Sequence, residues 1–271
     1  MLEINNLSKR FGKRVALNQV SLTLDEGIYG LLGPNGSGKT TLMRCIAGVM
    51  RPNSGTISYN NTIGYLPQKF GMFKELTVYE TMEYFCSLKK VPKAARRNAI
   101  LDCLENVNLV DRINDKIGAL SGGMIRRLGI AQTMLGNPSL ILVDEPTAGL
   151  DPEERLRFKN LMRKAFIGKT VLISTHIVED VESVCNNIII IDRGSVLTQC
   201  SAEELRLEAY GKVFSVPVAE KDRLIDPYYI VREEYGECES NLRVLSPTVQ
   251  SGPNVSPTIE DGYMLHIRRM I

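Results

Sequence analysis

The sequence predicts an α/β protein, in which a parallel or mixed sheet carries helices on both faces. Two observations predict this class. Strand-length apolar runs alternate with amphipathic stretches of helical length along much of the chain. Some of these runs, such as residues 27–32 and 140–143, are continuously apolar, which is typical of strands buried on both faces. The 271 residues allow one large domain, or one domain and a small one.

The N-terminal stretch has the alternation of half-buried strands. Residues 2–4 and 20–24 alternate apolar and polar side chains, and short strands are predicted at 56–59 and 62–66. A helix is predicted from residue 40 to 47, directly after a glycine-rich loop. The first 66 residues are therefore predicted to be mainly strands.

From residue 77 the apolar spacing becomes helical. Thr77 and Glu80 form a capping box, and amphipathic helices are predicted at 93–107 and 121–135. A mostly helical block, from about residue 70 to 135, is thus predicted to interrupt the α/β pattern.

The α/β pattern resumes at residue 140 and runs to about residue 210. Asp151 is placed to cap a helix that has Pro152 at its first position. A strand at 170–174, a helix at 176–184 and a hairpin that turns at Arg193-Gly194 are predicted to follow.

Residues 211–271 are predicted to form a small β-rich appendage. Its expected strands are 213–218, 229–234, 242–245 and 264–267. We therefore divide the chain into a domain at 1–210 and this appendage.

Charge and cysteine usage exclude several classes of protein. The formal net charge of +2 gives no global basic field, so no nucleic-acid partner is expected. The six cysteines show no CxxC pair, which argues against a zinc site or a disulfide framework and favours a reduced, cytosolic chain. They are Cys45, Cys86, Cys103, Cys185, Cys200 and Cys238. A basic run at 89–97 is interpreted as a solvated helix face, with contact to anionic lipid as the alternative.

No signal peptide or membrane span is predicted. The N-terminus lacks a basic start followed by an apolar run, and no apolar stretch approaches the ~18 residues that a span needs. We expect that the chain itself does not cross a membrane.

A glycine-rich loop follows the apolar run at 27–32 and opens a helix. Gly33, Gly38, Lys39 and Thr40 satisfy the GxxxxGK[ST] spacing. Glycines let backbone N–H groups point at phosphates, and the helix N-terminus adds partial positive charge. Lys39 would reach the β and γ phosphates, and Thr40 would bind Mg²⁺. The residues expected to bind ATP are Gly33, Pro34, Asn35, Gly36, Ser37, Gly38, Lys39, Thr40 and Thr41.

Two carboxylates follow the apolar run at 140–143. Ligands bind at the carboxyl edge of open α/β sheets, where Asp144 and Glu145 would lie. Asp144 would hold Mg²⁺, and Glu145 could deprotonate an attacking water. Taken alone, both could be solvated acids, but their combination with the Lys39 loop favours the catalytic interpretation.

These motifs resemble the nucleotide-binding subunit of an ATP-binding cassette (ABC) transporter. The resemblance covers about residues 1–210, in order. Leu120-Ser121-Gly122-Gly123 resembles the family's signature, which other phosphate-loop NTPases lack. The resemblance implies a P-loop NTPase sheet core with an N-terminal antiparallel β subdomain and an inserted helical subdomain.

Four further residues fall where the family has functional positions. Gln68 resembles the Q-loop glutamine, which contacts the metal, and Asp151 resembles the D-loop aspartate at the dimer interface. His176 resembles the switch histidine, and Phe11 falls where an aromatic ring stacks on adenine. Each residue alone has an ordinary structural alternative, but together their order favours the functional interpretation.

The resemblance implies a mechanism that needs two copies, or this chain and a homologous ATPase. Two ATP molecules would lie in a head-to-tail dimer, with Ser121, Gly122 and Gly123 of one copy covering the γ-phosphate held by the other. Glu145 would be the general base of ATP hydrolysis, and His176 would contact the γ-phosphate. The Gln68 loop and the helical block would pass the motion to an integral membrane permease subunit. The chain would then be peripheral on the cytoplasmic face of the cell membrane.

One departure from the family pattern is visible. Met124 stands where the family has glutamine after the signature. What this puts in doubt is a supporting hydrogen bond at the dimer interface, and not ATP binding.

Two weaker resemblances concern the direction of transport. Residues 69–78 and 258–263 resemble subunits of two-component exporters, so export of a drug, peptide or lipid-like substrate is favoured over import. The alternative is a soluble ABC ATPase that acts on a non-transport partner. The long coiled coil of the DNA-repair type and the second cassette of the translation type are both missing from the sequence.

Overall fold

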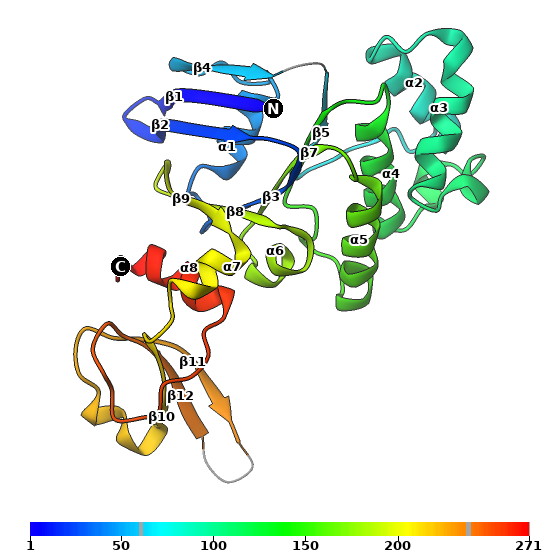
Figure 1. Ribbon diagram of the computed structural model, residues 1–271. Coiled ribbons are helices and arrows are strands. Elements are labelled where there is room, and N and C mark those ends of the chain that lie inside the picture. Colours follow the sequence, from blue (N-terminus) through cyan, green and yellow to red (C-terminus); the bar gives the residue numbers. More distant parts are fainter. Residues whose placement is uncertain (60–61, 237–239, 271) are drawn as a thin grey trace. The chain divides into compact units, whose positions relative to one another are not determined.

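The computed structural model describes residues 1–59, 62–236 and 240–270, so Cys238 lies outside the described residues. The chain forms two compact units (Figure 1). The first comprises residues 1–186 and 191–196, and the second comprises 187–190 and 197–271. Within the described residues, no helix has both the length and the apolar character needed to cross a membrane.

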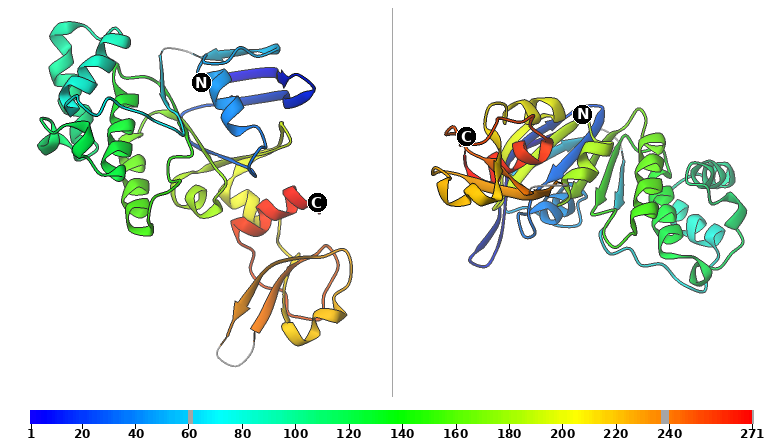
Figure 2. Two further views of the ribbon diagram at one scale, coloured as in Figure 1. Left: turned by 180° about the vertical axis from the view of Figure 1, so that it is seen from behind. Right: turned by 90° about the horizontal axis from the view of Figure 1, so that it is seen from below.

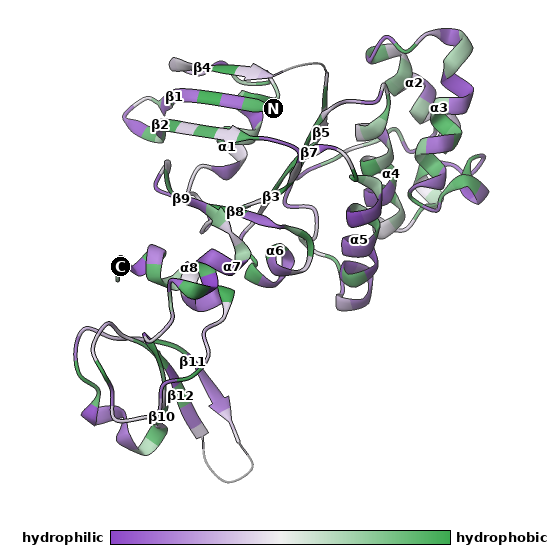
Figure 3. Cartoon of the chain, in the orientation of Figure 1, coloured by the Kyte–Doolittle hydropathy of each residue, from purple (hydrophilic) through white to green (hydrophobic). Residues whose placement is uncertain are grey.

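The N-terminal sheet is antiparallel, as predicted. It contains β1 (Leu2–Phe11), β2 (Arg14–Leu24) and β4 (Ser54–Tyr59) in the order β2-β1-β4. Hydrophobic and hydrophilic bands alternate along β1 and β2 (Figure 3), because successive side chains of a strand point to opposite faces. A two-residue connection at 12–13 joins these strands and leaves Phe11 paired with Arg14.

Four parallel strands form the centre of the first unit. They are β3 (Gly27–Leu32), β5 (Ile63–Leu66), β6 (Leu140–Asp144) and β7 (Thr170–Thr175), in the order β5-β6-β7-β3. All residues of β6 and β7 are buried, which confirms the predicted α/β core. Because parallel strands end at one edge of the sheet, the segments that follow β3, β6 and β7 meet there.

Three helices follow β3, β6 and β7 along the chain. They are α1 (Lys39–Ile46), α5 (Pro152–Ala165) and α6 (Val178–Val184). Helix α1 packs on β6, and α6 packs on β3 and β7. An ideal Cβ on Gly30 of β3 would lie 2.7 Å from Val181 Cγ1, so a glycine is needed for the close approach of α6.

The predicted helical block contains α2 (Val78–Leu88), α3 (Lys93–Glu105) and α4 (Gly122–Met134), with short 3₁₀ turns at Val110–Arg112 and Ile117–Ala119. The capping box of Thr77 and Glu80 is present. These helices lie on the opposite side of the parallel strands from the N-terminal sheet (Figures 1 and 2).

The interpretation of residues 89–97 as a solvated face is wrong for two of its basic residues. Lys89 Nζ donates to the carbonyl oxygens of residues 132, 133 and 135, at 2.5, 3.1 and 3.3 Å. It thereby satisfies carbonyls at the end of α4, which have no partner within the helix. Arg96 Nη1 lies 2.6 Å from Glu83 Oε1. Both contacts arise because α2 packs against α3 and α4. The helical spacing of the sequence does not predict this packing.

The hairpin of β8 (Asn187–Asp192) and β9 (Ser195–Ser201) turns at residues 193–194, as predicted. In the second unit, an antiparallel sheet has the order β10-β12-β11. The remaining elements of this unit are α7 (Ala202–Leu207), β10 (Val213–Pro217), a 3₁₀ turn at Val218–Arg223, β11 (Tyr229–Tyr235), β12 (Ser240–Leu245) and α8 (Ile259–Arg268).

The predicted strand at 264–267 is wrong, because these residues belong to α8. Thr258 caps the helix and forms a capping box with Asp261, an acid that the usual Glu or Gln form of the motif does not include. Ile259 and Tyr263 are both buried one helical turn apart. An ideal Cβ on Gly262 would lie 2.0 Å from Leu205 O, so α8 also packs very closely on α7.

Candidate nucleotide-binding site

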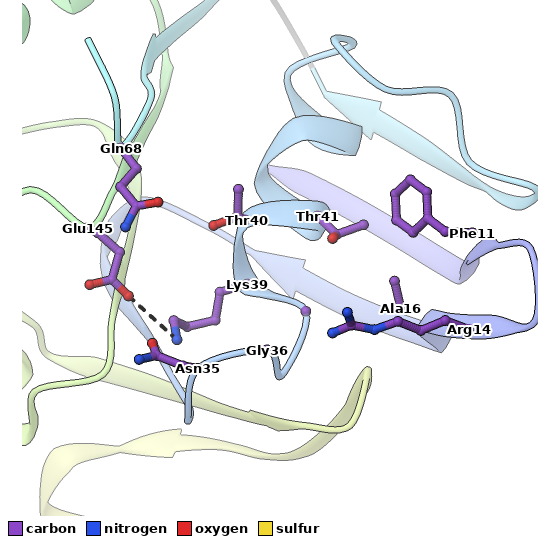
Figure 4. Close-up of a pocket in the computed structure, with 11 residues that line it drawn as sticks. Phe11, Arg14, Ala16, Asn35, Gly36, Lys39, Thr40, Thr41, Gln68 and Glu145 are labelled. Carbon is purple, nitrogen blue, oxygen red and sulfur yellow. Dashed lines mark ion pairs between the residues drawn. The ribbon is translucent and has the colours of Figure 1, made fainter.

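A cavity of about 300 Å³ lies beside the N-terminus of α1 (Figure 4). Its walls come from the N-terminal sheet, from the glycine-rich loop and from the segments after β5 and β6. The lining residues are Phe11, Arg14, Ala16, Asn35, Gly36, Gly38, Lys39, Thr40, Thr41, Gln68 and Glu145. Most of the predicted ATP-binding residues therefore meet in one cavity.

The glycine-rich loop is packed too closely for side chains at two positions. An ideal Cβ would lie 2.1 Å from Ile191 O at Gly33 and 2.6 Å from Ala16 O at Gly38. Gly38 also has φ of +113°, in the region that favours glycine. The spacing of these glycines therefore has a packing requirement as well as the predicted phosphate-binding one.

Lys39 reaches back across the loop. Its side chain is 6% exposed, and Nζ donates to Gly33 O at 2.6 Å and Pro34 O at 3.2 Å. Nζ also lies 3.6 Å from Glu145 Oε1 (Figure 4). Burial lowers the pKa of Lys39 below its ordinary value, and the Glu145 carboxylate partly offsets this shift.

Asp144 forms an oxygen-rich pair with Thr40, which lines this cavity. Asp144 is buried, and its Oδ1 accepts from Thr40 Oγ1 at 3.2 Å and from Ser174 Oγ at 2.5 Å. Asp144 Oδ2 is buried without a hydrogen-bond partner. Mg²⁺ prefers oxygen ligands and is held in proteins by one or two carboxylates together with phosphates. These residues fit such an ion, and Gln68 lines the same cavity as Thr40. Among the described residues, no cluster of three or more His, Cys, Asp or Glu side chains offers a different metal site.

Glu145 and His176 are in direct contact at this edge of the sheet. His176 Nδ1 lies 2.8 Å from Glu145 Oε2. Glu145 has φ of +50°, an uncommon value for a non-glycine residue, and its backbone N donates to Ser174 O and Ser174 Oγ. Such backbone strain is typical of functional sites. Here it accompanies a carboxylate that lies between Lys39 and His176.

Phe11 lies at the outer end of the cavity, with its side chain about half exposed. Arg14 and Ala16 line the same end but were missed from the sequence. The GxxxxGK pattern does not extend to β2, so only the hairpin register would have pointed to Arg14. Phe11 and Arg14 are cross-strand partners in that register.

The signature segment does not join this cavity within one chain. Ser121 and Gly122 are exposed. Ser121 caps α4 by accepting from Met124 N at 3.2 Å. Gly123 lies against Glu154, since an ideal Cβ there would be 2.4 Å from Glu154 Oε2. Asp151 is likewise outside the cavity and caps α5, as it accepts from Glu154 N at 2.8 Å.

Comparison with known proteins identifies the family. The profile described as "ABC transporter" matches residues 17–148. An uncharacterized ABC transporter ATP-binding protein of Bacillus subtilis, YxlF, is 35% identical over 229 residues, which cover 82% of this chain and 78% of that protein. The Nod factor export ATP-binding protein I of Burkholderia lata is 34% identical over 212 residues, which cover 73% and 70%.

A solved structure gives the same result. The dimeric post-hydrolysis state of the ATP-binding cassette MJ0796, bound to ADP and Pi, has a TM-score of 0.65 and 28% identity, and the match covers 74% of this chain and 98% of that one. The chain therefore belongs to the ABC transporter family, as one of its ATP-binding ATPase subunits.

Proposed function

We propose that this subunit hydrolyses ATP only in a head-to-tail dimer, in which each ATP lies between the Lys39 loop of one copy and the signature of another. One observation carries the proposal. The loop, Asp144, Glu145 and His176 are linked by contacts at one edge of the sheet. Ser121 and Gly122 are exposed and do not line the cavity beside α1. Such a half-site needs a second copy, or a homologous ATPase, to be completed.

The triphosphate would be held by backbone and charge. Loop N–H groups and the N-terminus of α1 would bind its oxygens, and Lys39 would exchange its partners Gly33 O and Pro34 O for phosphate. Thr41 lines the same wall beside Thr40. Phe11 would stack on the base, as aromatic side chains do on nucleic-acid bases.

The residues that would hold Mg²⁺ are Thr40, Gln68 and Asp144. When bound, this ion would neutralise charge on the phosphates. Ser174 fixes the Asp144 carboxylate through its 2.5 Å hydrogen bond, which leaves the second oxygen, Oδ2, for the ion.

Glu145 would accept the proton of the attacking water. Its carboxylate is held by Lys39 on one side and His176 on the other. Once Lys39 turns to the phosphates, His176 is the partner that remains to orient the carboxylate. His176 is partly exposed, so its ring could also reach a γ-phosphate at the dimer interface.

We also propose that the dimer drives export through a separate integral membrane subunit, with this chain peripheral on the cytoplasmic face of the cell membrane. The name of the Burkholderia lata relative, an export ATP-binding protein, supports this direction. The predicted exporter-like segment at 69–78 contributes Phe73, whose side chain is 60% exposed in the helical region. A drug, peptide or lipid-like molecule is the expected substrate class.

Glu145→Gln tests the dimer. The variant should bind ATP with Mg²⁺ and form an ATP-dependent dimer in size-exclusion chromatography with light scattering. Its turnover should fall by about 10²–10⁴, the usual contribution of a general base. A variant that remains monomeric with ATP, beside a wild type that hydrolyses ATP normally as a monomer, would sink the proposal.

Co-purification tests the transport partner. The tagged chain, expressed from its native locus, should retain an integral membrane protein after detergent extraction. Recovery of a soluble assembly in its place would favour the alternative, an ABC ATPase with a non-transport partner.

A further inference from the structure

Arg14 extends from the start of β2 toward the glycine-rich loop (Figure 4). It lies directly opposite Phe11 in the antiparallel register, so both side chains share one face of the hairpin. An ideal Cβ on Gly36 would lie 3.5 Å from Arg14 Nη2. The guanidinium group therefore lies close to the loop at Gly36.

The charge balance of the cavity gives Arg14 a distinct role. Three lining residues have ionised side chains, namely Arg14, Lys39 and Glu145. Lys39 and Glu145 lie 3.6 Å apart and offset each other. Arg14 therefore supplies the net positive charge of the wall, and within the described part of the chain no ion pair of Arg14 is found.

The geometry points to Arg14 as a nucleotide-binding residue that contacts the α- and β-phosphates on the base side of the loop. This inference rests on the proposed ATP binding and specifies a further contact of the same site. Lys39 and Glu145 lie at the far end of the cavity, where the γ-phosphate is expected, and Phe11 lies at the base end. A planar guanidinium with several N–H donors matches phosphate oxygens between these two ends.

A contact to the α- and β-phosphates does not distinguish ATP from ADP. Arg14 then strengthens the binding of substrate and product equally. Such uniform binding lowers KM and leaves kcat unchanged. The same contact would slow the release of ADP.

Isothermal titration of the full chain with ADP and with a non-hydrolysable ATP analogue tests the inference. Arg14→Ala should raise the Kd of both nucleotides by roughly tenfold, the equivalent of one hydrogen bond to a charged group. The loss should shrink at high salt, because the interaction is between charges. Arg14→Lys should restore part of the affinity. Lys13→Ala is the matched control, because Lys13 is exposed in the adjacent turn and does not line the cavity, and it should bind as wild type does.

Three outcomes would overturn the inference. A loss confined to the ATP analogue would place Arg14 at the γ-phosphate. A changed preference for the ATP analogue over the corresponding GTP analogue, titrated in the same way, would place Arg14 on the base. Unchanged Kd values would exclude a contact between Arg14 and the nucleotide. If Lys39→Ala also binds both nucleotides normally, the proposed site itself fails. If Lys39→Ala loses binding while Arg14→Ala does not, only the inference fails.

Discussion

The phosphate-loop cavity and the signature segment at 120–123 differ in burial and in the partners of their polar groups. Lys39, Asp144 and Glu145 are at most 6% exposed, and each contacts other residues of the site. Ser121 and Gly122 are exposed, and the Ser121 hydroxyl serves its own helix cap. One chain thus buries the polar groups of the phosphate-loop cavity and leaves the signature segment exposed, as the proposed dimer requires.

The buried half extends beyond the cavity. Lys159 Nζ lies 2.8 Å from Asp180 Oδ1, and both residues are under 9% exposed. Thr147 follows Glu145 and Pro146 in the sequence. Its hydroxyl donates a hydrogen bond to Asp180 Oδ2. Asp180 lies on α6, just after His176. This buried network ties the segments that carry Glu145 and His176 to each other.

The largest effect is expected from breaking this buried network. Asp180→Ala leaves the buried Lys159 ammonium without its counter-ion, with only its hydrogen bonds to Glu179 O and Ser183 Oγ, which should cost about 3–5 kcal/mol of unfolding free energy. Arg157→Ala is the control, because the Arg157–Glu153 pair on the same helix, α5, is more than 60% exposed on both sides. It should cost about 0–1 kcal/mol. Urea unfolding measures the loss of unfolding free energy in each variant. Equal losses would show that the buried ion pair contributes no more to stability than the exposed one.

A second large effect should follow from Lys39→Ala. Two charged hydrogen bonds to phosphate would be lost, so ATP affinity should fall by roughly 100-fold or more. Titration with fluorescent ATP measures this loss, and circular dichroism checks the fold. Unchanged affinity would contradict the phosphate-loop assignment.

Ser121→Ala tests the exposed half. Loss of the helix cap should cost about 1 kcal/mol of stability. The monomer should still bind ATP as tightly as wild type, because Ser121 does not line the cavity. In the Glu145→Gln background, the ATP-dependent dimer should be lost in size-exclusion chromatography. If the dimer is as stable as that of Glu145→Gln alone, Ser121 is not part of the second half of the site.

The same contrast explains which features the sequence could predict. The loop, Asp144-Glu145 and the helix caps at Thr77 and Asp151 depend on short, local spacings, and the structure has these elements where they were predicted. Arg14 depends on the pairing of two strands, which the loop motif does not encode. The last helix, α8, was missed because four apolar-rich residues fit a strand and a helix equally well, and only its packing on α7 decides between them.

Lys89 shows the effect of burial on a residue that looks solvated in the sequence, and it allows the smallest test. It holds the carboxyl end of α4, the helix whose other end carries the signature. Desolvation lowers the pKa of Lys89 to about 8 from its ordinary value of 10.5. Between these two values the unfolded chain binds this proton and the folded chain has lost it. The contribution of Lys89 to stability should therefore rise as pH rises from about 8 to 10.5.

Lys89→Met should remove this contribution. The difference in unfolding free energy between wild type and variant should then grow in favour of wild type across that interval and stay flat below it. Lys90→Met, at the exposed neighbouring position, is the control and should show no such slope. A slope of equal size in both variants would mean that Lys89 is as solvated as its neighbour. The carbonyl groups at the carboxyl end of α4 would then lack their contacts with Lys89 in solution.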